Sequence, residues 1–84
     1  MINKITLEHI KSKIKSHTFT KLPSGKVLIC EITLENGFTV RGEAAVVDPA
    51  NYVQVMGEEI AYKDAIDKIW QLEGYLLQQK IYES

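Results

Sequence analysis

The chain has few of the residues on which covalent cross-links and metal sites usually depend. It contains a single cysteine, Cys30, so an intrachain disulfide and a CxxC motif are both excluded. Cys30 lies within the largely apolar run 27–32, which predicts a buried and unreactive thiol, as is common in a reducing cytoplasm. The sequence also lacks a signal-peptide pattern and any apolar run of about 18 residues. We therefore expect a cytoplasmic protein with no membrane partner.

The chain has no excess of charge of either sign. Ten basic and eleven acidic residues give a net charge of −1, and Arg41 is the only arginine. This balance makes a nucleic-acid partner the weakest of the binding hypotheses, because such binders usually carry an excess of basic charge on one face. Lysines outnumber acids in the first 30 residues, where Glu8 is the one acidic residue. A solvated lysine-rich face is favoured there over a surface for an acidic partner.

Catalytic motifs are missing as well. The two histidines, His9 and His17, have no neighbour at metal-ligand spacing, which favours surface positions for both. Asp64 and Asp67 would share one face of a helix, where nearby lysines make ion pairs on the helix surface the favoured interpretation. No phosphate-binding loop or nucleophile–base arrangement is present. The sequence predicts a protein that is not an enzyme and binds neither metal nor cofactor.

What the sequence does contain is the pattern of a small domain that begins with a helix. Thr6 is a candidate N-cap, followed by Leu7, Ile10 and Ile14 on one face of a short helix. Three strands are expected next, over residues 16–22, 27–35 and 38–47.

The connections between these strands carry turn signals. Residues 23–26 read as a Pro-Gly turn, and Asn36-Gly37 predicts a type I′ hairpin turn, because both residues tolerate positive φ. Gly42 within the third strand predicts a bulge or a close backbone approach. Val27 and Ile29 add apolar side chains to the second face of their strand, so we expect that strand to be covered on both sides there.

A long helical pattern occupies the rest of the chain. Asp48 and Pro49 predict its start, as N-cap and first helical residue, and the pattern continues to about Tyr82. Its apolar stripe is broad and comprises Val53, Met56, Ile60, Ala65, Ile66, Ile69, Trp70, Leu72, Tyr75, Leu76 and Leu77. We expect a break or kink near residues 62–64 and another near 71–74.

Together these elements predict one α+β domain spanning residues 1–84. A short N-terminal helix precedes a three-stranded antiparallel meander, which packs against the long, kinked C-terminal helical segment. A chain of this size buries only about 60–65% of its unfolded surface, and its sheet has two edges that need covering. Both arguments predict a homodimer or higher oligomer.

The second half of the sequence resembles a known family of small bacteriophage proteins. The combined pattern is NGF…GE…DPxNY…KIWxLEGYLL, carried by residues 36–38, 42–43, 48–52 and 68–77. The family is named for gene 49 of coliphage N-four and gene 66 of a Shigella phage. The chain departs from it at Ala44 and Val46, where the family often has small polar residues or cysteine.

The resemblance implies a phage or prophage accessory protein expressed in the cytoplasm of a bacterial host. Small phage proteins of this size commonly inhibit host systems without catalysis. Several unrelated ones are oligomers that sequester nucleotide immune signals, and their behaviour extends to this chain by analogy alone.

Candidate ligand-binding residues occur in three parts of the sequence. Arg41 could bind a phosphate bidentately beside Gly42, although a cross-strand pair with Glu31 or Glu43 is favoured. The remaining candidates are Asn36, Phe38, Asn51, Tyr52, Trp70, Glu73 and Tyr75. Core packing is favoured for the aromatic residues at helical spacing, and Glu73 is the candidate least explained by packing.

Two functions of different kinds remain open at this point. The first is a counter-defence protein that holds a small phosphorylated nucleotide signal in an oligomer. The second is a protein that binds and inhibits a host protein directly, through a sheet edge or an apolar helix face.

Overall fold

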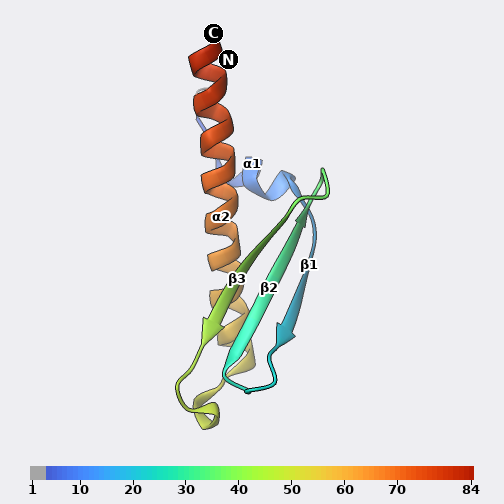
Figure 1. The fold of residues 1–84 in the computed structure, drawn as a ribbon, viewed down its shortest axis with the longest axis vertical. Helices are drawn as coiled ribbons and strands as arrows, with labels where there is room; N and C mark the ends of the chain where they lie inside the picture. The colour runs from blue at the N-terminus through green and yellow to red at the C-terminus, as the bar shows by residue number, and fades with distance from the viewer. Residues whose placement is uncertain (1–3) are drawn as a thin grey trace.

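The computed structural model describes residues 4–84 and shows one sheet packed against one long helix (Figure 1). The elements, in chain order, are α1 (Leu7–Ser12), β1 (Ile14–Lys21), β2 (Val27–Leu34), β3 (Thr39–Ala45), the 3-10 turn η1 (Pro49–Asn51) and α2 (Gln54–Glu83). The three strands are antiparallel in the order β1-β2-β3, and α2 crosses one face of the sheet. The predicted α+β architecture is confirmed.

The first helix begins as predicted but is shorter. The Thr6 hydroxyl oxygen accepts a hydrogen bond from the backbone N–H of His9 at 3.1 Å, which is the expected N-cap. Ile10 is fully buried, whereas Leu7 is half exposed. The prediction that Ile14 continues this helix is wrong. The Lys13 carbonyl accepts from Glu35 N–H at 2.8 Å, which draws the chain into the sheet, and Ile14 is the first residue of β1.

The hairpin between β2 and β3 forms at Asn36-Gly37 but not as a type I′ turn. The N–H of Gly37 donates to the Leu34 carbonyl, and the N–H of Leu34 donates to the Phe38 carbonyl. Only Gly37 has positive φ, at +90°, so this is a three-residue loop with glycine in the left-handed position. Asn36 keeps an ordinary φ because its side-chain oxygen accepts the N–H of Phe38 at 3.0 Å.

Burial alternates along β2, which shows that the sheet is covered on one face. The covered face contains Leu28, Cys30, Ile32 and Leu34, all buried beneath α2. Val27 and Ile29 point to the opposite face and stay partly exposed, so the prediction that the strand is covered on both sides is wrong. The reason is topological. The chain has one long helix, which already lies on the first face.

Gly42 marks the closest approach between the sheet and α2. A Cβ atom at this position would overlap the backbone of Ala61 and Ala65, both fully buried alanines of the helix. The predicted close backbone approach is therefore confirmed, with the helix as the approaching element. The alternative of a bulge is wrong for β3, whose pairing with β2 is regular. The irregularity of this sheet lies in β1, between Ile14 and Ser16.

The start of the long helix differs from the prediction. Asp48 accepts the N–H of Ala50 at 2.9 Å, but the turn that it caps is η1. The N–H of Tyr52 closes that turn on the Pro49 carbonyl, and Tyr52 and Val53 are then extended, so α2 begins only at Gln54. In this position the Tyr52 ring lies under the ammonium group of Lys21, 4.1 Å away.

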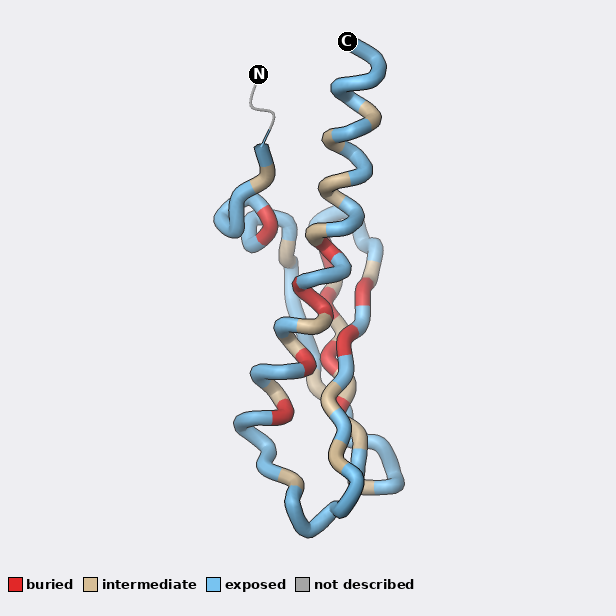
Figure 2. Tube along the Cα trace, turned by 90° about the vertical axis from the view of Figure 1, so that its left-hand side faces the viewer, coloured by how far each residue is buried: buried red, intermediate tan, exposed pale blue. Residues whose placement is uncertain are grey.

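Helix α2 runs without interruption through both segments where a break or kink was expected. One glycine costs about 1 kcal/mol relative to alanine, which is too little to end a helix of 30 residues. Such a helix spans about 45 Å, whereas strands of seven or eight residues span about 25 Å. The sheet therefore buries only the middle of the predicted apolar stripe, as the colours in Figure 2 show.

Candidate functional site

The predicted site residues lie in three places and do not form a single site within one chain. Asn36, Phe38 and Arg41 belong to the β2–β3 hairpin. Asn51 and Tyr52 lie around η1, and the remaining three candidates lie in the second half of α2 (Figure 1).

Arg41 lies on the open face of the sheet and is already paired. Its Nη1 is 3.6 Å from Oε2 of Glu31, the residue directly opposite it in β2. Both side chains are about half exposed. This is the cross-strand pair favoured by the sequence. Asn36 uses its side chain in the hairpin, and Phe38 is 55% exposed beside it, so the hairpin presents one apolar ring and one paired guanidinium to solvent.

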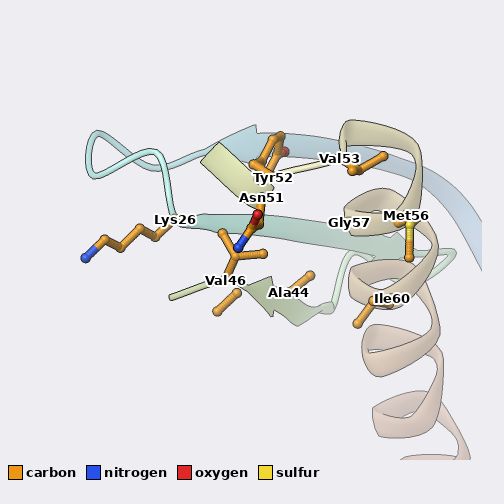
Figure 3. A pocket seen from close by; sticks show the side chains of 10 residues that line it. Lys26, Ala44, Val46, Asn51, Tyr52, Val53, Met56, Gly57 and Ile60 are labelled. Carbon is orange, nitrogen blue, oxygen red and sulfur yellow. The ribbon is translucent and has the colours of Figure 1, made fainter. Parts of the chain in front are cut away.

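Asn51 and Tyr52 line a small hollow between η1, the end of β3 and the start of α2 (Figure 3). We call it the η1 hollow. Its volume is about 110 Å³, and its walls are mostly apolar, with Val46, Met56 and Ile60 contributing. The Tyr52 hydroxyl donates to the side-chain oxygen of Gln54 at 2.6 Å. Ligand pockets are usually about 300–1,000 Å³, so this hollow is too small for a nucleotide.

A larger hollow lies between the N-terminal segment and the second half of α2. We call it the α1–α2 hollow. Its volume is about 440 Å³, which is in the range of small-molecule sites. It is lined by residues from two parts of the chain, 4–13 and 73–80, namely Lys4, Ile5, Thr6, His9, Lys13, Glu73, Leu76, Leu77 and Lys80. Of the predicted site residues, only Glu73 belongs to it.

Glu73 links the two walls of this hollow. Its Oε1 lies 2.5 Å from Nε2 of His9, although the two residues are 64 positions apart. The Glu73 side chain is only 14% exposed and that of His9 is 45% exposed. Glu73 therefore fastens α1 to α2, which accounts for an acidic residue inside an apolar helical segment. His9 is at the surface as predicted, but with a defined partner that sequence spacing could not reveal.

The lysines of the α1–α2 hollow were not among the predicted site residues. Lys4 and Lys13 are separated from Lys80 by most of the chain, so only the packing of α1 on α2 brings them together. The available signal was the excess of lysine in the first 30 residues. That excess was interpreted as a solvated face because nothing in the sequence places Lys80 beside it.

Comparison with known proteins identifies the family. A family model described as phage protein (N4 Gp49/phage Sf6 gene 66) matches residues 5–81. The chain belongs to this family. The match also covers α1 and β1, which extends the resemblance seen in the sequence to nearly the whole domain. No curated protein and no solved structure matches the chain.

The family member has a second notable surface at the free end of α2. Leu72, Tyr75, Leu76 and Tyr82 lie at helical spacing in the last part of α2, and this part of the helix extends past the end of the sheet (Figure 1). We call these four residues the α2 end stripe. Tyr75 is 69% exposed, Leu76 52% and Tyr82 79%. Trp70 lies just before the stripe on α2 and is partly buried against the core. Trp70 therefore has the core position that the sequence favoured for these aromatic residues, whereas Tyr75 does not.

Two kinds of site are missing from residues 4–84. No group of three or more His, Cys, Asp or Glu side chains is placed to hold a metal ion. None of the described helices combines the length and the apolar character needed to cross a membrane.

Proposed function

We propose that this phage protein acts in counter-defence by binding, as a homodimer or higher oligomer that sequesters a nucleotide-type immune signal. The observation that carries the proposal is the α2 end stripe, since it supports self-association. Oligomerisation is what lets so small a protein build a binding surface larger than either of its own hollows.

The composition of the stripe supports association over simple exposure. Single exposed apolar residues are normal on protein surfaces, but a contiguous group of two leucines and two tyrosines on one helix face is typical of an interface. Leu72 and Leu76 lie seven positions after Ala65 and Ile69 and so continue the direction of these two core-facing residues, which are fully buried by the sheet. Tyr75 and Tyr82 flank the two leucines on one side. A second copy would supply the cover that the sheet is too short to give.

One sheet edge is already protected, which favours the helix as the route of association. The Asp64 carboxylate accepts the N–H of Glu43 at 3.0 Å, and the Lys68 ammonium donates to the Arg41 carbonyl. Both backbone groups lie on the outer edge of β3. Because α2 side chains occupy them, addition of another strand at β3 is disfavoured.

Sedimentation velocity would test the oligomer directly. We expect the wild-type protein to sediment as a dimer or larger species at about 50 µM, a concentration that populates a dimer with a dissociation constant of about 1 µM. Exchange of Tyr75 and Tyr82 for serine should give a monomer with an unchanged helical circular dichroism spectrum. Glu59→Ser with Lys63→Ser is the matched control and should leave the oligomer intact, because both residues are exposed and lie at least about 100° around α2 from Tyr75 and Tyr82. A monomeric wild type would contradict the proposal.

The signal-binding part of the proposal needs its own measurement. Thermal unfolding in the presence of cyclic dinucleotides and linear nucleotides should show a rise in midpoint for at least one of them, because a ligand that binds only the native state stabilises it. If no messenger in the panel raises the unfolding midpoint of the oligomer, the sequestration of a nucleotide is contradicted. Self-association is unaffected by that result.

The same stripe also favours a second function, direct inhibition of a host protein. In that case the stripe is the surface for a host partner instead of a second copy. Affinity capture from host lysate should then recover one protein reproducibly with the wild type and lose it with the Tyr75 and Tyr82 exchange. Failure to recover any such protein would eliminate this alternative.

A further inference from the structure

We propose that the α1–α2 hollow is a binding site for a small organic anion that carries at least two negative charges and an apolar or ring-shaped portion. This inference rests on the proposed function and places its ligand at a defined site. A phosphorylated nucleotide has this chemistry, and so does an alkyl phosphate.

The charge of the hollow is the first argument. Lys4, Lys13 and Lys80 line it together, while the whole chain carries a net charge of −1. No ion pair within residues 4–84 involves any of these three ammonium groups. Like charges that the fold brings together repel each other unless an anion lies between them. Ammonium groups from separate segments are also a common way to hold phosphate oxygens.

The state of Glu73 is the second argument. It is the one acidic residue that lines the hollow, and its Oε1 is already held by His9. Within residues 4–84, no lysine ammonium is paired with this carboxylate. If the three lysines were compensated from within the chain, Glu73 would be the available partner, and the structure directs it elsewhere.

The apolar wall is the third argument. Ile5, Leu76 and Leu77 form the part of the lining between the lysines. A bare inorganic ion would leave this wall exposed to water. A ligand with a base or an alkyl group would cover it and gain roughly 25 cal/mol for each Å² of apolar surface removed from water. The combination of charge and wall therefore selects an organic anion over a simple one.

The hollow also adjoins the proposed interface. Leu76 belongs to both the α2 end stripe and the lining of the hollow. A second copy seated on the stripe would lie against the opening. Ligand binding and self-association should consequently strengthen each other.

Isothermal titration calorimetry on the full chain at low salt would test the site. The probes are inorganic phosphate, ADP, cyclic di-AMP and decyl phosphate. We expect at least one organic probe to bind at least about tenfold more tightly than phosphate, with an affinity that falls as salt is added. A preference for ADP and cyclic di-AMP indicates a nucleotide site, and a preference for decyl phosphate indicates an alkyl phosphate site.

Variants then locate the site. Lys13→Gln with Lys80→Gln should weaken the best probe at least about tenfold, because the exchange removes two charge-assisted contacts to the anion. Lys63→Gln, at an exposed position of α2 outside the hollow, is the control and should bind as the wild type does. Leu77→Gln should weaken the organic probes but not phosphate.

The outcomes separate this inference from the proposed function. Binding that is unaffected by the Lys13 and Lys80 exchange would overturn the hollow as the site and leave sequestration standing. Binding that depends on both lysines in a protein that remains monomeric would support the hollow and contradict the oligomer. Absence of measurable heat with all four probes would overturn the inference outright.

Discussion

At the scale of single residues, Gly42 determines how closely the helix can approach the sheet. The alanines opposite it on α2, Ala61 and Ala65, have no exposed surface, and a Cβ atom on Gly42 would overlap their backbone. Three small residues thus bring two backbones into contact. The consequence is a thin, tightly packed centre that tolerates no added volume.

Gly42→Ala should destabilise the protein by about 3 kcal/mol, because the helix must move away from β3 to make room. Urea unfolding followed by circular dichroism would measure the change. Gly74→Ala is the matched control. A Cβ there meets nothing within 4 Å, so this exchange should be neutral or stabilise by up to about 1 kcal/mol. Equal effects of the two exchanges would contradict the packing described here.

Cys30 is the second residue with a defined consequence. It is fully buried between β2 and α2, and desolvation by burial raises the pKa of its thiol above the ordinary value of 9.0. The thiol is therefore both inaccessible and protonated at neutral pH.

Alkylation of Cys30 by iodoacetamide at pH 8 should be much slower in the native protein than in urea, because a buried, protonated thiol is unreactive. The sign of the pH effect on stability follows from the same shift. A raised pKa means that the folded state keeps a proton that the unfolded state loses, so this contribution to stability is present below pH 9.0 and falls as the pH rises above it. Rapid native alkylation would show that Cys30 is accessible.

At the scale of elements, α2 both covers the sheet and protects its β3 edge. Asp64 and Lys68 lie one turn apart on the helix and bind backbone groups of Glu43 and Arg41. At β1 the contacts with α2 are made by aromatic side chains instead. His17 and Phe19 pack edge-to-face with each other, and His17 also contacts Tyr62 of α2. Helix α2 therefore contacts both edge strands of the sheet, β1 and β3.

Asp64→Ala should cost about 1–2 kcal/mol, because it leaves the Glu43 N–H without its partner. The control is Asp67→Ala, an exposed residue of the same helix, which should change stability by less than about 0.5 kcal/mol. Hydrogen exchange at Glu43 should also become faster in the first variant only. An unchanged exchange rate would mean that the bond to Asp64 does not protect the edge.

The elements were largely predictable from local patterns, and the errors have specific physical causes. The alternation in β2 and the Thr6 cap were sufficient to predict a strand and a helix start. The type I′ turn was wrong because Asn36 satisfies Phe38 with its side chain and has no need of positive φ. The helix start at Asp48 was wrong because a 3-10 turn uses the same cap and the same proline.

The site was less predictable than the fold. Arg41 was correctly expected to pair across the strands, since register follows from the hairpin. The α1–α2 hollow depends on packing between residues 4–13 and residues 73–80, which are at least 60 positions apart, as in the contact of His9 with Glu73. Side chains assembled by tertiary packing leave no mark at short spacing in the sequence, which is why Lys4, Lys13 and Lys80 could not be grouped in advance.

At the scale of the whole molecule, the protein is elongated, with extents of 53 × 21 × 18 Å. The core occupies the part where α2 and the sheet overlap, and the remainder of α2 extends past it (Figures 1 and 2). This free end bears the α2 end stripe on one side and borders the α1–α2 hollow. We propose that association with a second copy completes the apolar surface of this end.

Native mass spectrometry of the full chain purified from a bacterial host tests this account most directly, because it measures oligomer mass and bound small molecules together. We expect a dimer or larger species that releases a small phosphorylated molecule upon denaturation. A species with the mass of one chain and no bound molecule, at concentrations where the free α2 ends should associate, would contradict the account.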